Sequence, residues 1–392
     1  MNVLEHEGKK IFQKYGIPVP RGKVVTTPSA AKEAATVLAG EVVLKAQVTA
    51  GGRGKAGGIR FAKTPPEAEK EAMSLLGRRI KEIEVKSLLV EERLRGEKEF
   101  YAGITIDDRL GKPVLLCTPE GGMDVEAVSQ RSSQNLFRFP FHPVQGAFPY
   151  QVRSFAYRHF ADKKTASHLV PILESLIRMF LEKDLTLVEV NPLILTQKGG
   201  FVAADAKIVV DDNALFRQPE MRPLEEDSYD HPIEREASKR GFYYVDLDGD
   251  IGVLTHGAGI GMFTVDMIRK KGGKPANFLD IKGQDRAKVR EQAGTMEKRM
   301  RTELEIVYSN PKIKAVLFNT FAGIGRCDEV AKGIRKYVEE HALPVPLVVR
   351  LAGTNAREGF EILRGLPVIV AESLEEAVEA AIKVGGPHGS IG

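Results

Sequence analysis

Residues 45–58 read KAQVTAGGRGKAGG, and five glycines fall within positions 51–58 of this run. Glycines have no side chain, so successive backbone N–H groups of such a loop can surround an anion. Arg53 and Lys55 add positive charge to the same turn, which follows an apolar strand pattern ending at Val48. The pattern favours a phosphate-binding loop over its alternative, a flexible hairpin. Its spacing matches neither the Walker loop nor the dinucleotide-binding fingerprint.

Lys45 lies inside the preceding strand pattern, in an apolar context. A lysine at such a position is either a buried phosphate ligand or a residue whose charged end reaches the surface. Next to a basic glycine loop, the ligand interpretation is favoured.

Three further polar residues lie at expected strand ends, namely Glu189, Asn191 and Asp205. Carboxylate and amide oxygens are the ligands that Mg²⁺ prefers when it bridges nucleotide phosphates. The alternative is structural, with Glu189 and Asp205 pairing with lysines such as Lys207. In one domain with a basic glycine loop, these residues indicate phosphoryl transfer.

Glu91 and Glu99 flank the stretch 92–98 and follow an apolar strand pattern. A carboxylate at this point could accept hydrogen bonds from a base or a ribose. Exposed charge is the alternative, and the residue type alone favours it slightly.

The chain divides near residue 238, because 392 residues exceed one ordinary core. Residues 1–238 mix helix and strand patterns, and 218–240 read as a charged, proline-containing linker. In 239–392, short apolar strands alternate with helices, which predicts a doubly wound parallel sheet. The expected strands are Ile251–Leu254, Ala276–Asp280, Ala315–Asn319, Pro346–Arg350 and Pro367–Val370.

Glycine-containing turns follow three of these strands, THGAG at 255–259, FAGIGR at 321–326 and RLAGTN at 350–355. Such turns meet at the carboxyl edge of a parallel sheet, where helix N-termini favour anions. The three turns together predict an anionic-ligand site at this edge.

Composition disfavours several classes of protein. There are 57 Lys and Arg against 53 Asp and Glu, and the resulting +4 does not favour a nucleic-acid partner. Two cysteines, Cys117 and Cys327, exclude a disulfide framework and fit a reducing compartment. No apolar run is long enough to cross a bilayer, and the start does not read as a signal peptide. We therefore expect a cytoplasmic protein without a membrane partner.

Long blocks of the sequence resemble the β subunit of succinyl-CoA synthetase, also called succinate–CoA ligase. The blocks occur in order along essentially the whole chain and are NVLEHEGKKIFQKYGIPVP, QVTAGGRGKAGG, EVNPL with AADAK, DDNALFRQP, PANFLD, FAGIGRCDEVAKGI and VPLVVRLAGTN. The resemblance implies an α+β ATP-grasp nucleotide-binding domain at 1–238 and a flavodoxin-like α/β CoA-ligase domain at 239–392.

The resemblance also implies a role for individual residues. The residues implied to bind the nucleotide are Lys45, Gly52, Arg53 and Gly54 at the phosphates, and Glu91, Glu99 and the main chain of Leu94 at the base and ribose. Those implied to ligate Mg²⁺ are Asn191 and Asp205. Glu189 would orient a phosphohistidine supplied by an α subunit, which would also hold most of the CoA. Those implied to bind the acid are His256, Gly323, Ile324 and Gly325.

Three positions on the acid-binding edge depart from the family pattern. The family usually has Asn at His256, a larger residue at Gly325, and another glycine-rich turn in place of Ile281-Lys282-Gly283-Gln284. Loss of a side chain at Gly325 enlarges the pocket, and His256 or Lys282 could meet extra oxygens. FAGI-x-RCD and RLAGTN also resemble malate–CoA ligase β subunits. Drift without a change of substrate is the alternative and is slightly favoured.

The expected function is the nucleotide-binding β subunit of an acid–CoA ligase, in which acid, CoA and ATP (or GTP) give acyl-CoA, ADP (or GDP) and phosphate. Succinate is the first candidate for the acid, with malate or another di- or tricarboxylate as the alternative. Among the eight histidines only His256 lies in a candidate site, where the family has a substrate contact, so the phosphorylated histidine is expected on the partner. A stand-alone ATP-grasp carboxylate–amine ligase is a more remote enzyme class. A non-enzymatic nucleotide-sensing or scaffold subunit ranks last, since the expected metal ligands are present.

Overall fold

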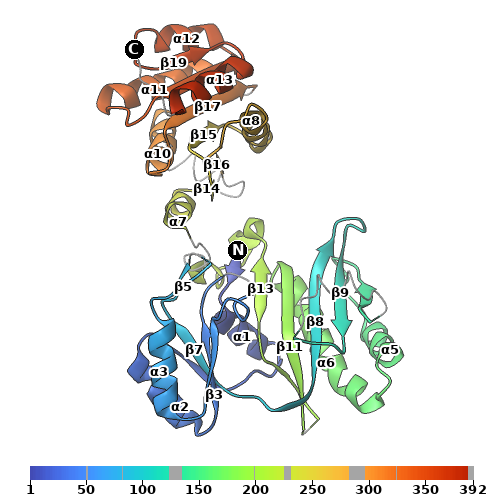
Figure 1. Cartoon of the computed structure of the whole chain (residues 1–392). Helices are drawn as coiled ribbons and strands as arrows, with labels where there is room; N and C mark the ends of the chain where they lie inside the picture. Colours follow the sequence, from blue (N-terminus) through green and yellow to red (C-terminus); the bar gives the residue numbers. More distant parts are fainter. Residues whose placement is uncertain are drawn as a thin grey trace. The chain divides into compact units, whose positions relative to one another are not determined.

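The computed structural model describes residues 1–49, 52–81, 83–122, 135–197, 199–224, 231–281, 296–323 and 325–386. Contacts between residues divide the chain into two units, Met1–Ser228 and Tyr229–Gly392. Figure 1 labels many of their helices and strands.

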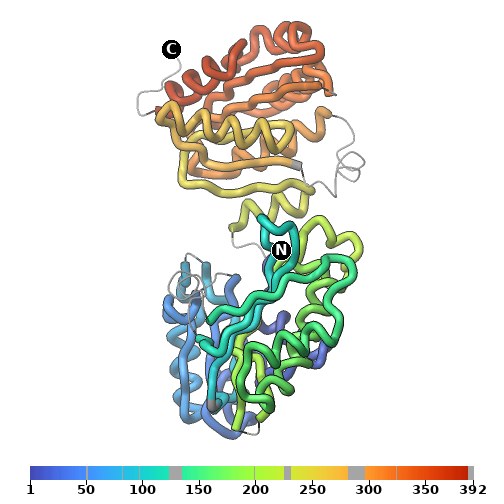
Figure 2. The backbone as a smooth tube through the Cα atoms, turned by 90° about the vertical axis from the view of Figure 1, so that its right-hand side faces the viewer, coloured from blue at the N-terminus to red at the C-terminus, as the bar shows by residue number. Residues whose placement is uncertain are grey.

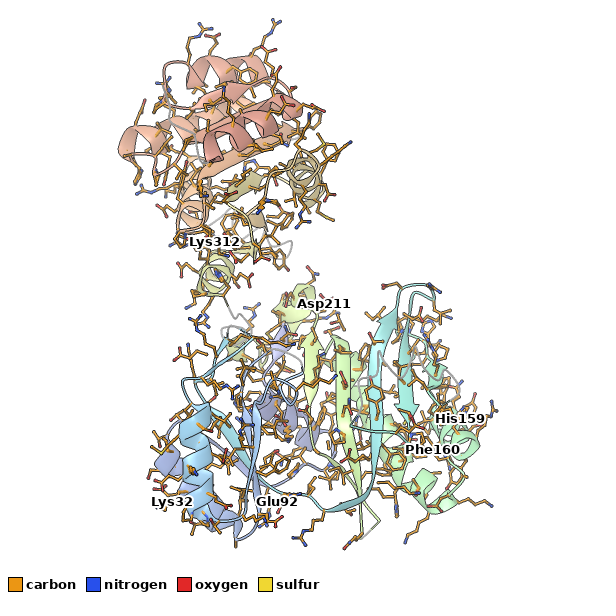
Figure 3. All side chains as sticks on the ribbon, viewed as in Figure 1. Lys32, Glu92, His159, Phe160, Asp211 and Lys312 are labelled. Atoms are coloured by element: carbon orange, nitrogen blue, oxygen red, sulfur yellow. The ribbon has the colours of Figure 1, made fainter. Side chains whose placement is uncertain are left out.

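The larger sheet of the first unit is antiparallel and has the order β1-β13-β11-β8-β9-β10, with β12 paired to β11. The strands are β1 (Asn2–Val3), β8 (Gly96–Asp107), β9 (Lys112–Thr118), β10 (Phe137–Pro140), β11 (Leu185–Thr196), β12 (Phe201–Ala203) and β13 (Lys207–Val210). The helices that share its core are α1 (Glu5–Lys14), α5 (Pro149–His159) and α6 (Lys163–Glu182). Phe160, labelled in Figure 3, follows α5. Its ring packs against that of Phe100 of β8, with the ring centroids 5.9 Å apart.

The smaller sheet of the first unit is also antiparallel, with the order β2-β7-β3-β4. Its strands are β2 (Gly22–Val25), β3 (Val42–Ala46), β4 (Ile59–Ala62) and β7 (Leu88–Glu92), and a separate hairpin is made by β5 (Arg79–Ile80) and β6 (Ile83–Glu84). Helices α2 (Pro28–Leu38) and α3 (Pro65–Leu75) pack on it. The side chains of Thr27 and Thr64 cap them by accepting from the backbone N–H groups of Ala30 and Glu67.

The segment expected to be a linker, 218–240, contains helical structure. Its described parts include the 3₁₀ helix η2 (Arg222–Leu224), which follows η1 (Asp212–Arg217), and helix α7 (Pro232–Lys239). Ala237 of α7 is buried in a core shared with the second unit's strands. The expected boundary after residue 238 therefore falls inside a helix that packs on the second unit.

Four of the five strands expected in the second unit form a parallel sheet with the order β15-β17-β18-β19, whereas the expected strand Ala276–Asp280 corresponds to β16, which lies outside that order. The strands of this sheet are β15 (Ile251–Thr255), β17 (Ala315–Ala322), β18 (Leu347–Gly353) and β19 (Ile369–Ala371). Strand β16 (Asn277–Ile281) pairs antiparallel with β14 (Phe242–Asp246), and a parallel bridge between Ile251 and Pro275 joins it to β15.

Helices cover both faces of this sheet, which confirms the doubly wound expectation. Side chains of α8 (Ala258–Lys270) and α13 (Leu374–Gly385) form one core with the sheet. Side chains of α10 (Met296–Tyr308), α11 (Cys327–Glu340) and α12 (Ala356–Leu363) form another. Figure 2 traces the same backbone from the side. Among the described residues, no helix has the length and apolar character of a membrane span.

Candidate functional site

The glycine loop between β3 and β4 folds back on the end of β3. Gly52 has a φ of +74° and Gly57 a φ of +75°, values that favour glycine. The N–H of Gly58 donates to the carbonyl of Arg53 at 2.8 Å, which closes the turn. Nη1 of Arg53 donates to the carbonyl of Ala46 at 3.1 Å, so the Arg53 side chain is held at the end of β3. Ala50 and Gly51 lie outside the described residues.

Lys45 is buried between two carboxylates. Its Nζ lies 2.9 Å from Glu5 of α1 and 3.0 Å from Glu91 of β7, and it donates to the carbonyl of Ala204. The alternative in which this lysine reaches the surface is therefore wrong. Glu91, also expected near a nucleotide, is buried beside it.

Arg53 and Lys9 complete a group that we call the ion cluster, made of Glu5, Lys9, Lys45, Arg53, Glu91 and Asp205. Arg53 lies 3.0 Å from both Glu5 and Asp205. Lys9 lies 2.6 Å from Glu91 and 2.9 Å from Glu5. The cluster joins α1, β3, the glycine loop, β7 and the segment between β12 and β13. It thus gathers four of the expected site residues, Lys45, Arg53, Glu91 and Asp205.

The charges of Glu5 and Lys45 sustain each other, whereas burial lowers the pKa of Lys9 and raises that of Asp205. Burial alone would raise the pKa of Glu5, but Lys45, Lys9 and Arg53 hold it well below its usual range. Burial opposes the charge on Lys45, yet Glu5, Glu91 and Asp205 raise its pKa above the ordinary value. Glu5 and Lys45 are therefore both ionised at neutral pH.

The expected Mg²⁺ ligands Asn191 and Asp205 lie on adjoining segments. The N–H of Ala204 donates to the carbonyl of Pro192 at 3.1 Å, which links the residues next to each of them. Oδ1 of Asn191 accepts from Gly122 at 2.9 Å, and Oδ1 of Asp205 is paired with Arg53. Among the described residues, no three His, Cys, Asp or Glu side chains group as a metal site. One carboxylate and one amide oxygen fit Mg²⁺, which takes few protein ligands when phosphates and water supply the rest.

Glu189 lies near Asn191 and Lys207. Oε1 of Glu189 is 3.5 Å from Nδ2 of Asn191, and Oε2 is 3.9 Å from Nζ of Lys207. Glu189 and Lys207 are opposite each other in the pairing of β11 with β13. The pairing with lysine expected for Glu189 under the structural alternative is thus present, at long range.

Glu99 and Leu94 are not members of the ion cluster. Glu99 is an exposed residue of β8, and its carbonyl accepts from the N–H of Gly121 at 2.9 Å. A Cβ on Gly122 would lie 2.5 Å from Oε2 of Glu99, so only glycine fits here without displacing that side chain. Leu94 is half-buried between β7 and β8.

The three glycine-containing turns of the second unit follow neighbouring parallel strands. Thr255 is paired with Asn319, and Ala322 with Gly353, which sets His256, Gly323 and Gly325 at the same edge of the sheet. A Cβ added to Gly323 or Gly325 would meet nothing within 4 Å. Ile324 and residues 282–284 lie outside the described residues.

His256 is held by a buried carboxylate that the sequence patterns did not reveal. Its Nε2 lies 2.9 Å from Glu303 of α10, whose other oxygen accepts from Nε of Arg299 at 2.8 Å. Burial raises the pKa of Glu303, but His256 and Arg299 outweigh it and hold the pKa below 4.5. An ionised carboxylate only accepts hydrogen bonds, so Nε2 of His256 carries the hydrogen and Nδ1 stays free of Glu303.

Sequence reasoning also missed Glu5 and Lys9. They are separated by one helical turn and lie on the buried face of α1 with Phe12. Charged residues at this spacing are usually exposed pairs. The available signal was that both fall on the stripe that the helix's apolar residues bury.

Comparisons with known proteins cover both units. The ATP-grasp domain family matches residues 2–195 and the CoA-ligase family matches residues 254–384. The β subunit of GDP-forming succinate–CoA ligase from Thermus thermophilus is 43% identical over 386 residues, covering 98% of this chain and 99% of its own. The ADP-forming β subunit from Roseiflexus sp. is 40% identical, with the same coverage of both chains.

A solved structure shares the whole fold at low sequence identity. ATP citrate lyase from Methanothrix soehngenii, in complex with citrate and coenzyme A, matches with a TM-score of 0.75 and 17% identity over 97% of this chain and 99% of that one. With the relatives above, the two domain matches settle the family. The chain belongs to the succinate–CoA ligase β-subunit family.

Proposed function

We propose that this chain is the nucleotide-binding β subunit of an acid–CoA ligase that converts acid, CoA and ATP to acyl-CoA, ADP and phosphate. The observation that carries the proposal is the convergence of Lys45, Arg53, Glu91 and Asp205 in one cluster beside the glycine loop. Membership of a family whose relatives are ligase β subunits supports it. We assign the nucleotide to Met1–Ser228 and the acid to Tyr229–Gly392.

In the nucleotide site, Lys45, Arg53 and the backbone of Gly52 and Gly54 bind the phosphates. Glu91, Glu99 and the main chain of Leu94 contact the base and ribose. Cations held at a glycine loop stabilise the charge that develops during phosphoryl transfer. ATP is the nucleotide proposed, with GTP as the alternative, since relatives of both kinds match.

Asn191 and Asp205 would hold Mg²⁺, and Glu189 would orient the phosphohistidine of the partner. When bound, the ion would neutralise charge on the nucleotide phosphates. Asp205 pairs with Arg53 in this structure, so the chain's own contribution is a carboxylate kept next to a phosphate-binding cation.

The phosphorylated histidine and most of the CoA site belong, we propose, to an α subunit. The relatives' names describe subunits, and His256 is engaged by Glu303. The buried free thiols Cys117 and Cys327 support a reducing compartment, the cytoplasm.

Calorimetry and activity assays of the full chain test this function. The chain alone is expected to bind Mg-ATP, and Asp205→Asn to weaken that binding more than that of ATP without Mg²⁺. CoA-dependent ADP release should require added α subunit of a succinate–CoA ligase. Robust ligase activity of the isolated chain would contradict the divided site, and ADP release with an amine but no CoA would indicate the carboxylate–amine ligase.

Succinate is the acid proposed, and the arrangement at His256 supports a second candidate. Glu303 engages Nε2 of His256, so Nδ1 is the ring nitrogen that would meet an additional oxygen, as in malate or citrate, and a Cβ on Gly325 would meet nothing within 4 Å. A panel of succinate, malate and citrate with the reconstituted pair distinguishes these acids. The double variant H256N/G325V is expected to shift preference toward succinate. An unchanged profile would show that the two positions do not set specificity.

A further inference from the structure

Helix α1 contributes two charged side chains to the ion cluster that have no role in the proposed nucleotide site. Glu5 and Lys9 have side chains that are 0% and 5% exposed. Buried charges are costly unless they are paired, so their presence beside Lys45 and Arg53 requires an explanation.

Lys9 and Lys45 contact the same three acceptors. Each Nζ lies within 3.0 Å of carboxylate oxygens of both Glu5 and Glu91. Each also donates to the carbonyl oxygen of Ala204. If Lys45 turned to another anion, Lys9 would therefore still pair with both Glu5 and Glu91.

Glu5 contacts all three cations of the ion cluster. Its carboxylate oxygens lie 2.9 Å from Lys9, 2.9 Å from Lys45 and 3.0 Å from Arg53. Lys45 and Arg53 are the side chains proposed above to bind phosphate. With Glu91 and Asp205, the cluster has three cationic side chains and three carboxylates, so its formal charge is zero without a nucleotide.

We propose that Glu5 and Lys9 are a resident counter-ion pair for the nucleotide site. Without nucleotide, Glu5 neutralises Lys45 and Arg53; nucleotide phosphates displace it from them, and Lys9 then retains Glu5 and Glu91. Both are positioning residues, which act through Lys45, Arg53 and Glu91. The inference rests on the proposed nucleotide site and adds to it a competition between a protein carboxylate and phosphate.

The competition gives the two single variants opposite effects. Glu5→Gln removes the competing anion and leaves a net positive cluster, so polyphosphates should bind about fivefold to tenfold tighter. Lys9→Met leaves Glu5 and Glu91 to Lys45 and Arg53 alone, and binding should weaken by a similar factor. The double variant E5Q/K9M restores neutrality and should bind as the wild type does. A merely structural role would weaken binding in both single variants.

Calorimetric titration of the full chain with Mg-ATP, tripolyphosphate and AMP tests this inference. The change in affinity should be larger for Mg-ATP and tripolyphosphate than for AMP, because the competition acts on phosphate charge. Glu7→Gln and Lys10→Met provide a matched control, since these residues form a 2.6 Å ion pair on the exposed side of the same helix. Both control variants should bind as the wild type does.

Glu5→Asp is the fallback variant if circular dichroism shows that E5Q does not fold. Its shorter side chain keeps the charge but loosens the contacts with Lys45 and Arg53, so tighter polyphosphate binding is again expected. Unchanged binding in the Glu5 variant, or weaker binding in both single variants, would overturn the counter-ion pair. A wild-type chain that binds neither Mg-ATP nor tripolyphosphate would overturn the nucleotide site itself.

Discussion

Glu303 is a carboxylate with no exposed surface, paired with His256 and Arg299. Removing one member of a buried ionic group leaves the others unpaired, so Glu303→Gln should lower the free energy of unfolding by about 3 kcal/mol at neutral pH. Chemical denaturation followed by circular dichroism measures the change.

The pH dependence of the same variant has a definite sign. The folded pKa of Glu303 lies below the ordinary 4.5, so the unfolded state takes up the proton first on acidification. The stabilisation that ionised Glu303 gives the folded state is therefore complete above about pH 4.5 and is lost as the pH falls through the folded pKa. The difference in unfolding free energy between the wild type and E303Q should shrink over the same pH range. Glu305→Gln is the matched control on the same helix, since its half-exposed pairs with Arg301 and Arg240 should contribute under 1 kcal/mol. An equal deficit at all pH values would contradict the role of ionisation.

At the residue scale, the sequence indicated the strand and loop residues of the candidate site but not the helical ones. Lys45 and Arg53 belong to a local glycine pattern, which indicates a phosphate-binding loop even when the fold is not known. Glu5 and Glu303 lie in helices, where carboxylates are usually exposed, and only tertiary packing shows that they are buried. The exposed pair Glu7 and Lys10 has a nearly identical sequence signature.

At the element scale, helix α11 packs against α10 through a glycine. A Cβ on Gly333 would lie 2.8 Å from Cγ of Met300 and 3.2 Å from Cα of Glu297, and the backbone contact cannot be relieved by a side-chain rotation. Gly333→Ala should therefore lower the free energy of unfolding by about 1–3 kcal/mol despite alanine's better helix propensity. Thermal unfolding measures the shift.

The control for this packing is a helical glycine with open surroundings. A Cβ on Gly259 of α8 would meet nothing within 4 Å, so Gly259→Ala should leave stability unchanged or raise it by up to about 0.5 kcal/mol. Equal losses in the two variants would contradict the contact with α10 as the cause of the effect.

Sequence patterns predicted the elements of the second unit's sheet because buried parallel strands are short, nearly continuous apolar runs. Helix α7 was not predicted, since PIEREASK buries only Ala237 and otherwise reads as a charged connection.

At the scale of the whole molecule, the described hydrophobic residues form four clusters, and none contains residues of both units. Two lie within Met1–Ser228 and two within Tyr229–Gly392. A unit with its own core can unfold as a unit. Calorimetry of the full chain is therefore expected to show two transitions, of which Gly333→Ala lowers only one.

Nucleotide identifies the other transition, because a ligand stabilises only the unit that binds it. At about 100 times its dissociation constant, Mg-ATP adds about 2.7 kcal/mol to the unfolding free energy of that unit. The transition untouched by Gly333→Ala should therefore move upward with Mg-ATP, and by less in Asp205→Asn, whereas the other should stay in place. A single transition that Mg-ATP and Gly333→Ala both shift would mean that the units unfold together, whatever their separate cores. Two transitions that both rise with Mg-ATP would place nucleotide contacts in both units and contradict a nucleotide site confined to the first.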